Sequence, residues 1–340
     1  MSEVSIIGLD LAKNVFQVHG ATAQGERQFN KKITRSRMHK FFSSQPPCLV
    51  AMEACSSAHY WAREIATFGH DVRLIPPAYV KPFVKRQKND AADAEAISEA
   101  ASRPNMRFVA VKTVDKQAAC MAFRTRDLFV RQKTQLINAL RGHLSEYGVI
   151  APQGISHVDK LKAVVEEKDN NLPTAVVLYC EMILGQIAQL EDMIKELELE
   201  IRTGAKQDDL QKRLMTIPGI GPITAAAITA YAPPPETFSK GRDFAAWIGI
   251  TPRQFSSGGK QKLGRITRMG QRDLRRLLIT GAMAVVRWAV RREPVKGSWL
   301  AGMLVRKPRM LVAVALANRM ARIVWAIMAH GGSYRDPIAS

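Results

Sequence analysis

The pattern of hydrophobic and polar positions over the first hundred residues predicts short strands, and then strands that alternate with helices. Apolar or β-branched runs that predict strands cover residues 4–9, 15–19, 28–34, 49–52 and 72–75. Helical periodicity covers residues 58–68 and 91–101. A strand meander followed by this alternation predicts a mixed α/β sheet with helices on its faces.

The middle of the chain is predicted to be helical. Residues 116–147 are helical and basic, and we expect them to complete a first domain over residues 1–150. Apolar residues then recur at alternating steps of four and three, at Ile183, Ile187, Leu190, Ile194, Leu197 and Ile201. This heptad pattern favours a coiled-coil connector over residues 151–205 that joins two subunits, and the alternative is an amphipathic helix packed on its own domain.

A polar stretch at residues 203–209 predicts a boundary before a mainly helical C-terminal domain, residues 206–340. Near its end, the apolar run 310–330 contains Arg319 and Arg322, which a membrane-spanning helix hardly tolerates at mid-depth. We therefore interpret this run as a core helix and expect no membrane partner.

The charge of the chain points to nucleic acid. Fifty Lys and Arg against thirty Asp and Glu give a formal net charge of +20, which favours capture of polyanions. Four scattered cysteines without metal-ligand spacing predict reduced, buried thiols in a cytoplasmic protein, at Cys48, Cys55, Cys120 and Cys180.

Four carboxylates could form a metal site. Asp10 and Glu53 each end an apolar strand, and Asp90 and Asp93 share one face at the start of a helix. If the sheet brings them together, their repulsion favours a divalent cation, with Mg²⁺ or Mn²⁺ suited to oxygen ligands. Alternatively, Asp90 and Asp93 are simple helix-start carboxylates favoured by the dipole.

Two glycine-containing segments could contact phosphates. Gly219 and Gly221 lie in a tight apolar turn before a helix, which resembles a helix-hairpin-helix element, with a packed turn as the alternative. The second segment holds Ser256 and Ser257 before a glycine pair. By itself it is typical of a flexible loop that grips phosphates, and its expected nucleic-acid contacts are Arg253, Lys260, Lys262, Arg265, Arg268 and Arg272.

Several segments, taken in order, resemble the bacterial insertion-sequence transposases of the DEDD type, a family of RNA-bridge-guided recombinases. They are Gly8–Lys13, Met52–Ala54, Lys88–Ala94, Ile217–Gly221 and Ser256–Lys260 with the Gly264–Arg268 stretch behind it. The likeness covers nearly the whole chain and keeps the order of the motifs.

The resemblance implies a RuvC-like, RNase H-fold domain at the start of the chain, with a Mg²⁺-binding tetrad at Asp10, Glu53, Asp90 and Asp93. It also implies a C-terminal transposase domain whose serine attacks DNA and forms a covalent phosphoserine link. That serine maps onto Ser257, with Ser256 as the alternate. Dimers or tetramers, donor and target duplex DNA, a noncoding guide RNA and a place at the bacterial nucleoid are further expectations.

Two other functions remain open from the sequence. A junction-resolving nuclease would use water and the four carboxylates without a serine adduct. A non-catalytic basic nucleic-acid-binding protein would use the acidic residues only at helix starts. Metal dependence separates this binding protein from the two enzymes, and a covalent protein–DNA adduct separates the transposase from the nuclease.

Overall fold

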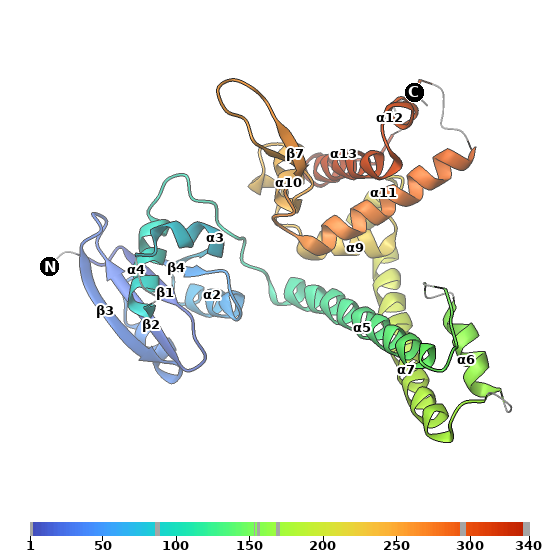
Figure 1. Ribbon diagram of the computed structural model, residues 1–340. Coiled ribbons are helices and arrows are strands. Elements are labelled where there is room, and N and C mark those ends of the chain that lie inside the picture. Colours follow the sequence, from blue (N-terminus) through green and yellow to red (C-terminus); the bar gives the residue numbers. More distant parts are fainter. Residues whose placement is uncertain are drawn as a thin grey trace. The chain divides into compact units, whose positions relative to one another are not determined.

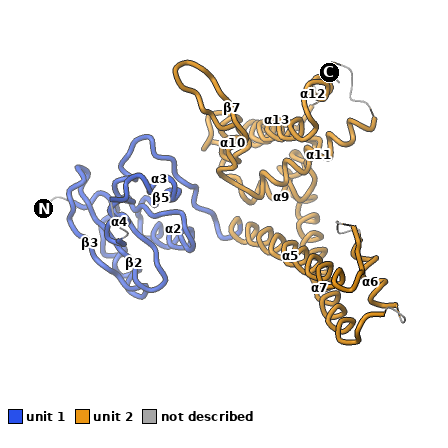
Figure 2. The backbone as a smooth tube through the Cα atoms, viewed as in Figure 1, with its two compact units in different colours: residues 1–115 blue, residues 116–340 orange. Residues whose placement is uncertain are grey.

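The computed structural model describes residues 3–85, 89–152, 154, 157–167, 171–292 and 297–335. The chain divides into two compact units, residues 1–115 and 116–340 (Figure 2). Each unit is described by itself below.

Unit 1 is built on a five-stranded sheet in the order β3-β2-β1-β4-β5 (Figure 1). Its strands are β1 (Ile6–Asp10), β2 (Val15–Ala21), β3 (Arg27–Thr34), β4 (Leu49–Glu53) and β5 (Asp71–Ile75). The first three pair antiparallel as a meander, whereas β4 pairs parallel with both β1 and β5. The predicted mixed sheet is confirmed.

Helices cover both faces of this sheet, and they are η1 (Arg35–Arg37), α1 (Met38–Ser43), α2 (Ala58–Ala66), α3 (Pro77–Val80), η2 (Lys81–Phe83) and α4 (Asp90–Ala101). Side chains alternate between the faces of a strand. On β1, Ile7 and Leu9 are therefore buried in the cluster that contains α1 and α2, while Ile6 packs in the cluster that contains α4. Gly8 and Asp10 share the face of Ile6, so β1 presents Asp10 on the α4 side of the sheet.

Unit 2 is helical apart from one short hairpin. Its elements are α5 (Val114–Ser145), α6 (Val158–Glu166), α7 (Thr174–Gln207), α8 (Asp209–Leu214), α9 (Pro222–Tyr231), η4 (Pro235–Thr237), α10 (Gly241–Ile248), β6 (Pro252–Gln254), β7 (Leu263–Ile266), α11 (Arg272–Arg292), α12 (Trp299–Arg306) and α13 (Arg309–His330). Buried residues from α5, α8, α9, α10, α11 and α13 form one large core, and α12 packs against it with partly buried residues. This mainly helical C-terminal part agrees with the sequence prediction.

The long helix α5 packs within unit 2 and not on the sheet of unit 1, while a functional first domain over residues 1–150 stays a prediction. Its residues Cys120 and Phe123 are buried in the core that α9, α11 and α13 share. Helical periodicity marks which face of a helix is apolar, but it does not say which of two possible cores will take that face. The four cysteines are free thiols; Cys120 and Cys180 are buried as expected, whereas Cys48 is half-buried and Cys55 is exposed.

The helices α5 and α7 run side by side in opposite directions (Figure 1). Arg126 pairs with Glu198, and Lys133 pairs with Glu191 at 3.4 Å between Nζ and Oε1. The heptad residue Ile187 is buried with residues of α5 and α6 in the same chain, and Leu190 and Ile194 are buried as well. The apolar seam thus has a partner within its own chain, while its role between subunits stays a prediction.

The helix α13 is long and apolar enough to cross a membrane by length and composition. In unit 2 it is a core helix, as predicted, because Val312, Ala317, Ala321 and Val324 are fully buried against its neighbours.

The helix α7 continues to Gln207 and packs on α8 and α9, so the connector and the C-terminal segment share one unit. The predicted division at residues 150 and 205 therefore differs from the compact units, and separate roles for its three segments stay a prediction.

Candidate carboxylate and serine sites

The first candidate site lies where β1 and β4 end. These strands are parallel neighbours, with Leu9 opposite Met52, so their last residues Asp10 and Glu53 lie at the same edge of the sheet. Both residues also fall on the α4 face, because Ile6 and Leu49, four positions earlier on their strands, pack in the α4 cluster. Strand pairing alone therefore brings two predicted carboxylates together.

The start of α4 supplies the other two carboxylates. Asn89 caps the helix, since its side chain accepts a hydrogen bond from the Ala91 backbone N–H at 3.0 Å. Asp90 and Asp93 follow in the first turn. Lys88, part of the motif that carried the resemblance, lies outside the described residues.

A close approach between helix and strand sets the position of α4. A Cβ added at Gly8 would lie 2.1 Å from the Ala94 carbonyl oxygen and 2.7 Å from the Ser98 nitrogen. The helix backbone therefore rests directly on β1 at this residue. Only glycine permits this distance, so Gly8 determines how near Asp90 and Asp93 lie to Asp10.

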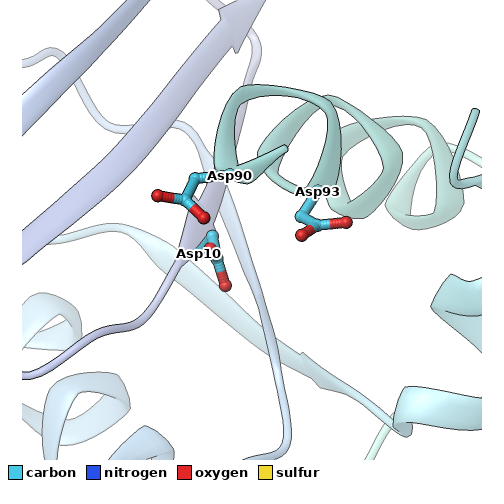
Figure 3. Close-up of side chains that lie close together, drawn as sticks. All are labelled: Asp10, Asp90 and Asp93. Carbon is cyan, nitrogen blue, oxygen red and sulfur yellow. The ribbon is translucent and has the colours of Figure 1, made fainter. Parts of the chain in front are cut away.

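Asp10, Asp90 and Asp93 offer ligand oxygens that all lie within 4.8 Å of one another (Figure 3). Asp10 and Asp93 are half-buried and Asp90 is exposed. Glu53 is not within this group of three, yet its charge acts on Asp10. The structure thus brings three of the predicted residues into one cluster and sets the fourth at its border.

The cluster has a strong electrostatic signature. Burial, followed by the charges of Asp93, Asp90 and Glu53, raises the pKa of Asp10 from 3.8 to about 6. Burial and Asp93 likewise raise the pKa of Glu53. No lysine or arginine forms an ion pair with these four carboxylates in the part of the chain that the structure describes. Crowded carboxylates without a basic partner either take up protons or bind a cation.

Sequence reasoning missed two polar residues that join the sheet to α4. The Gln17 side chain donates to Asn30 Oδ1, and Asn30 Nδ2 donates to the Ala91 carbonyl at 3.3 Å. Gln17 lies opposite Asp10 in the β1–β2 register. The sequence did contain a signal for this pair, because Gln17 is a polar residue within an apolar strand. A side-chain amide that is buried there needs a hydrogen-bond partner.

The glycine turn between α8 and α9 has a packing role. Gly219 has a left-handed φ of 89°, and a Cβ there would lie 2.8 Å from the Gly281 carbonyl oxygen of α11. Gly221, in contrast, is exposed at the N-cap of α9 and has open space around it. Packing against α11 therefore accounts for Gly219, while phosphate contact at either glycine stays a prediction.

The predicted serines lie on the hairpin formed by β6 and β7. Gly258 and Gly259 have φ values of 55° and 75°, and the Lys260 N–H donates to the Ser257 carbonyl at 3.0 Å. Two central residues with positive φ characterise the tight turn that joins two antiparallel strands. The glycine pair thus shapes the hairpin tip, and Ser257 stands at the first position of that turn.

The two serines differ in their contacts. Ser256 Oγ accepts a hydrogen bond from the Lys262 backbone N–H at 3.4 Å, whereas the Ser257 hydroxyl has no partner among the described residues. Both are exposed. No Asp or Glu occurs in the sequence from Phe244 to Arg272, so the hairpin carries no carboxylate base of its own.

The predicted nucleic-acid residues surround this hairpin. All of them are exposed: Arg253, Lys260, Lys262, Arg265, Arg268 and Arg272. Arg253 donates to the Thr267 carbonyl at 3.2 Å, which ties one strand of the hairpin to the segment behind β7. The hairpin is a strongly basic surface without acidic side chains of its own.

Comparison with known proteins identifies the family. A DEDD transposase model of the IS110 type matches residues 7–149, and the model described as "Transposase IS116/IS110/IS902 family" matches residues 211–295. The chain belongs to the IS110/IS116/IS902 transposase family. The two matched segments contain the carboxylate cluster and the serine hairpin, respectively.

Relatives extend this match over nearly the full length. A probable family 20 transposase of Pseudomonas aeruginosa is 46% identical, and the alignment covers 98% of this chain and 99% of that protein. The transposase for insertion sequence element IS1328 of Yersinia enterocolitica is 39% identical, with coverage of 97% and 98%. The transposase for IS1111A of Coxiella burnetii is 35% identical, with coverage of 98% and 92%. The predicted resemblance is confirmed, and DNA strand transfer is the general activity of such a transposase.

Proposed function

We propose that this transposase excises and inserts its own insertion sequence through a covalent serine–DNA intermediate, with a divalent cation held by the carboxylate cluster. The observation that carries the proposal is the convergence of Asp10, Asp90 and Asp93 within 4.8 Å in a chain of this family. Catalytic roles for these residues, for Glu53 and for Ser257 are part of the proposal.

The donor set fits a divalent cation. Three carboxylates that meet without an ion pair to any described basic residue offer hard oxygen ligands. The raised pKa of Asp10 reflects burial and then the neighbouring negative charge, which a cation would neutralise. Asp10, Asp90 and Asp93 would hold the ion, with Glu53 at the border. Mg²⁺ is the preferred ion and Mn²⁺ the alternative. When bound, such an ion supplies Lewis acidity at a phosphodiester oxygen.

Ser257 is the proposed nucleophile. Its oxygen would form a bond to the phosphorus of a DNA phosphodiester while one ester P–O bond breaks, and the departing sugar oxygen takes up a proton. The serine proton needs an acceptor, and the residues around Ser257 in the sequence offer none. We infer that a carboxylate of the cluster, from the same or another copy of the chain, accepts this proton. The exposed position of the hairpin supports such an encounter.

We further infer that unit 1 is a RuvC-like, RNase H-type domain. The three-stranded meander followed by two parallel strands, with helices on both faces, supports this assignment. Guidance by a structured noncoding RNA, assembly into dimers or tetramers, and nucleoid association belong to the same proposal. The net charge of +20 supports a large nucleic-acid partner.

The test is a search for the protein–DNA adduct. Full-length protein is incubated with end-labelled element-end DNA, the noncoding RNA and Mg²⁺, and the products are separated under denaturing conditions with and without protease. We expect a slow band that protease removes. Ser257→Ala should eliminate it, whereas Ser256→Ala, the matched neighbour, should retain most of it.

Two results would change the assignment. An adduct that persists in Ser257→Ala and disappears in Ser256→Ala moves the nucleophile by one residue. Metal-dependent cleavage without any protease-sensitive adduct makes water the nucleophile, and the junction-resolving nuclease then replaces the serine mechanism.

A further inference from the structure

A large cavity in unit 2 lies outside both candidate sites. It has a volume of about 1570 Å³ and is bordered by α11, α12, α13 and the base of the β6–β7 hairpin. Its walls are apolar at Ile279, Val314 and Ala315. Arginines from three segments border it, among them Arg265, Arg268, Arg272, Arg275, Arg319 and Arg322. None of the described residues that line it is acidic.

Much of this positive charge is unpaired. Another lining residue, Arg276, pairs with Asp127, and Arg275 donates to the Ile248 carbonyl at 2.8 Å. Arg319 lies 5.3 Å from the Trp299 ring centroid. Four other arginine side chains form no hydrogen bond or ion pair with the described residues: Arg265, Arg268, Arg272 and Arg322. Such a concentration of arginine forks selects a phosphate-bearing ligand.

The arginine-bearing segment before α11 is held rigidly. A Cβ at Gly249 would lie 2.1 Å from the Met269 carbonyl oxygen, and one at Gly270 would lie 1.9 Å from the Trp247 carbonyl oxygen. Arg268 itself has a left-handed φ of 56°. The backbone is thus packed tightly onto the end of α10, which fixes where Arg268 leaves the chain.

The mixture of charge and apolar surface decides which phosphate ligand fits. The outside of a duplex offers phosphates and sugars, whereas an unpaired nucleotide also offers the flat face of a base, which stacks on apolar and aromatic side chains. Trp299 and Trp325 both line the cavity. The volume exceeds the roughly 300–1,000 Å³ of ordinary small-molecule sites, so more than one nucleotide has room.

We propose that this cavity binds one or two unpaired nucleotides of a nucleic-acid strand, with the bases against the apolar wall of α13 and the phosphates on the arginines. The inference rests on the chain acting on nucleic acid, but on neither the serine nor the carboxylates. It gives the transposase a means to hold a strand that has left its duplex.

The test is a binding measurement with two short probes that differ only in their bases. Fluorescence anisotropy in EDTA compares hexathymidylate with an abasic hexamer that carries the same phosphates. Wild-type full-length protein should bind hexathymidylate about tenfold more tightly, since stacking acts only on the probe with bases. Equal affinity for the two probes would overturn the proposal.

Two variants of the apolar wall locate the effect. Ala315→Trp places an indole ring on the apolar wall, where it occupies part of the space proposed for the bases, and should reduce the difference between the probes. Leu311→Glu places a negative charge at a half-exposed position on the same wall and should weaken hexathymidylate binding, which keeps the test valid if the tryptophan variant does not fold. If a folded variant, either Ala315→Trp or Leu311→Glu, still shows the wild-type difference in affinity between the two probes, the bases do not bind at this wall.

Charge variants supply the matched control. Arg319→Gln with Arg322→Gln removes two charges inside the cavity, and Arg287→Gln with Arg291→Gln removes two exposed charges of α11 outside it. The first pair should weaken hexathymidylate binding about tenfold more than the second. Equal losses would reassign the effect to net charge alone and overturn the site.

Other occupants would give different results. If Arg319→Gln with Arg322→Gln weakens binding to phosphatidylglycerol vesicles but not to hexathymidylate, the cavity binds a lipid surface. Dissociation of an oligomer in Leu311→Glu, without loss of hexathymidylate binding, would assign it to a second copy of the chain. Either result overturns the nucleotide site. The two proposals can fail separately. If wild-type protein forms no adduct but Ser257→Ala still binds hexathymidylate, only the serine mechanism is refuted.

Discussion

The carboxylate cluster and the serine hairpin are built in opposite ways. The cluster stands on the ends of two central strands and on a capped helix, and its spacing depends on backbone contact at Gly8. The hairpin is two-stranded and exposed along almost its whole length, and the Ser257 hydroxyl forms no hydrogen bond with the described residues. The difference suggests a fixed site that holds charge and a projecting site that delivers a hydroxyl.

The largest expected effect follows from removing one charge of the fixed site. Asp10→Asn keeps the shape of the side chain but removes the negative charge of one proposed metal ligand. The rate of strand cleavage should therefore fall by about 10³-fold or more. The measurement is cleavage of labelled element-end DNA with Mg²⁺. Asp71→Asn, an exposed carboxylate paired with Arg73 in the same unit, is the matched control. Comparable activity in the two variants would remove Asp10 from the site.

A second prediction breaks the spacing of the fixed site without touching its carboxylates. Gly8→Ala places a methyl group against the Ala94 carbonyl, so α4 must shift and carry Asp90 and Asp93 away from Asp10. Cleavage should fall about tenfold to a hundredfold, and overpacking should cost about 1–3 kcal/mol of unfolding free energy. Kinetics and thermal unfolding measure the two effects.

Gly185→Ala provides the control for this prediction. Gly185 lies inside α7 with open space around it, so alanine there should raise the unfolding free energy by about 0.5–1 kcal/mol. Full activity in a folded Gly8→Ala protein would mean that the helix contact does not set the working distance between the carboxylates.

The third prediction concerns the projecting site. Gly259→Val forces a β-branched residue into the left-handed conformation of the turn, which costs about 1–2 kcal/mol locally and should displace Ser257. Adduct formation should fall about tenfold while the melting temperature stays constant, because the hairpin packs on little else. Gly259→Asn, which tolerates positive φ, should retain activity. Equal loss in both variants would point to a need for glycine itself at the tip.

The smallest effect is a pH dependence of stability in the metal-free protein. Because the folded pKa of Asp10 is raised to about 6, the folded chain binds that proton more tightly than the unfolded chain. Stability should therefore rise as the pH falls from above 6 towards 4. Asp10→Asn removes this dependence and should be more stable than wild type at pH 8 by roughly 1 kcal/mol, a figure discounted for the partial exposure of the group.

Thermal unfolding in EDTA from pH 4 to pH 8 measures this difference between Asp10→Asn and wild type. The two curves should approach each other as the pH falls from 6 towards 4, because Asp10 becomes protonated in the folded chain below about pH 6. A constant offset across the range would mean that the substitution acts through packing and not through charge.

The sheet was predictable, because apolar runs predict both strands and place Asp10 and Glu53 at their ends. The sequence left open whether these ends meet, and the parallel pairing of β1 with β4 decides it. Two other features were not predictable. The partner of α5 could not be read from its own sequence, since Phe123 fits either core by pattern alone. The close contacts at Gly8 and Gly219 depend on residues 86 and 62 positions away, Ala94 and Gly281, whose proximity exists only in the folded chain.

For the serines, the sequence suggested a close approach to phosphate as the reason for the glycine pair. The structure gives a local reason, since Gly258 and Gly259 form the turn itself. The glycine pair therefore has a structural role in the turn, while its contact with phosphate stays a prediction. The resemblance ranks Ser257 over Ser256, and the structure adds a difference between them, because only Ser256 accepts a hydrogen bond from the Lys262 backbone N–H.

The contact between Gly8 and Ala94 also orders events during synthesis of the chain. β1 leaves the ribosome early, but the face that carries Gly8 and Asp10 stays uncovered until α4 is synthesised. The cluster joins distant parts of the sequence, and we therefore expect it to form late in the folding of unit 1. The cluster of three aspartates is therefore absent from nascent chains that lack α4. A shortened product that ends before residue 90 would carry Asp10 and Glu53 without the other half of the site.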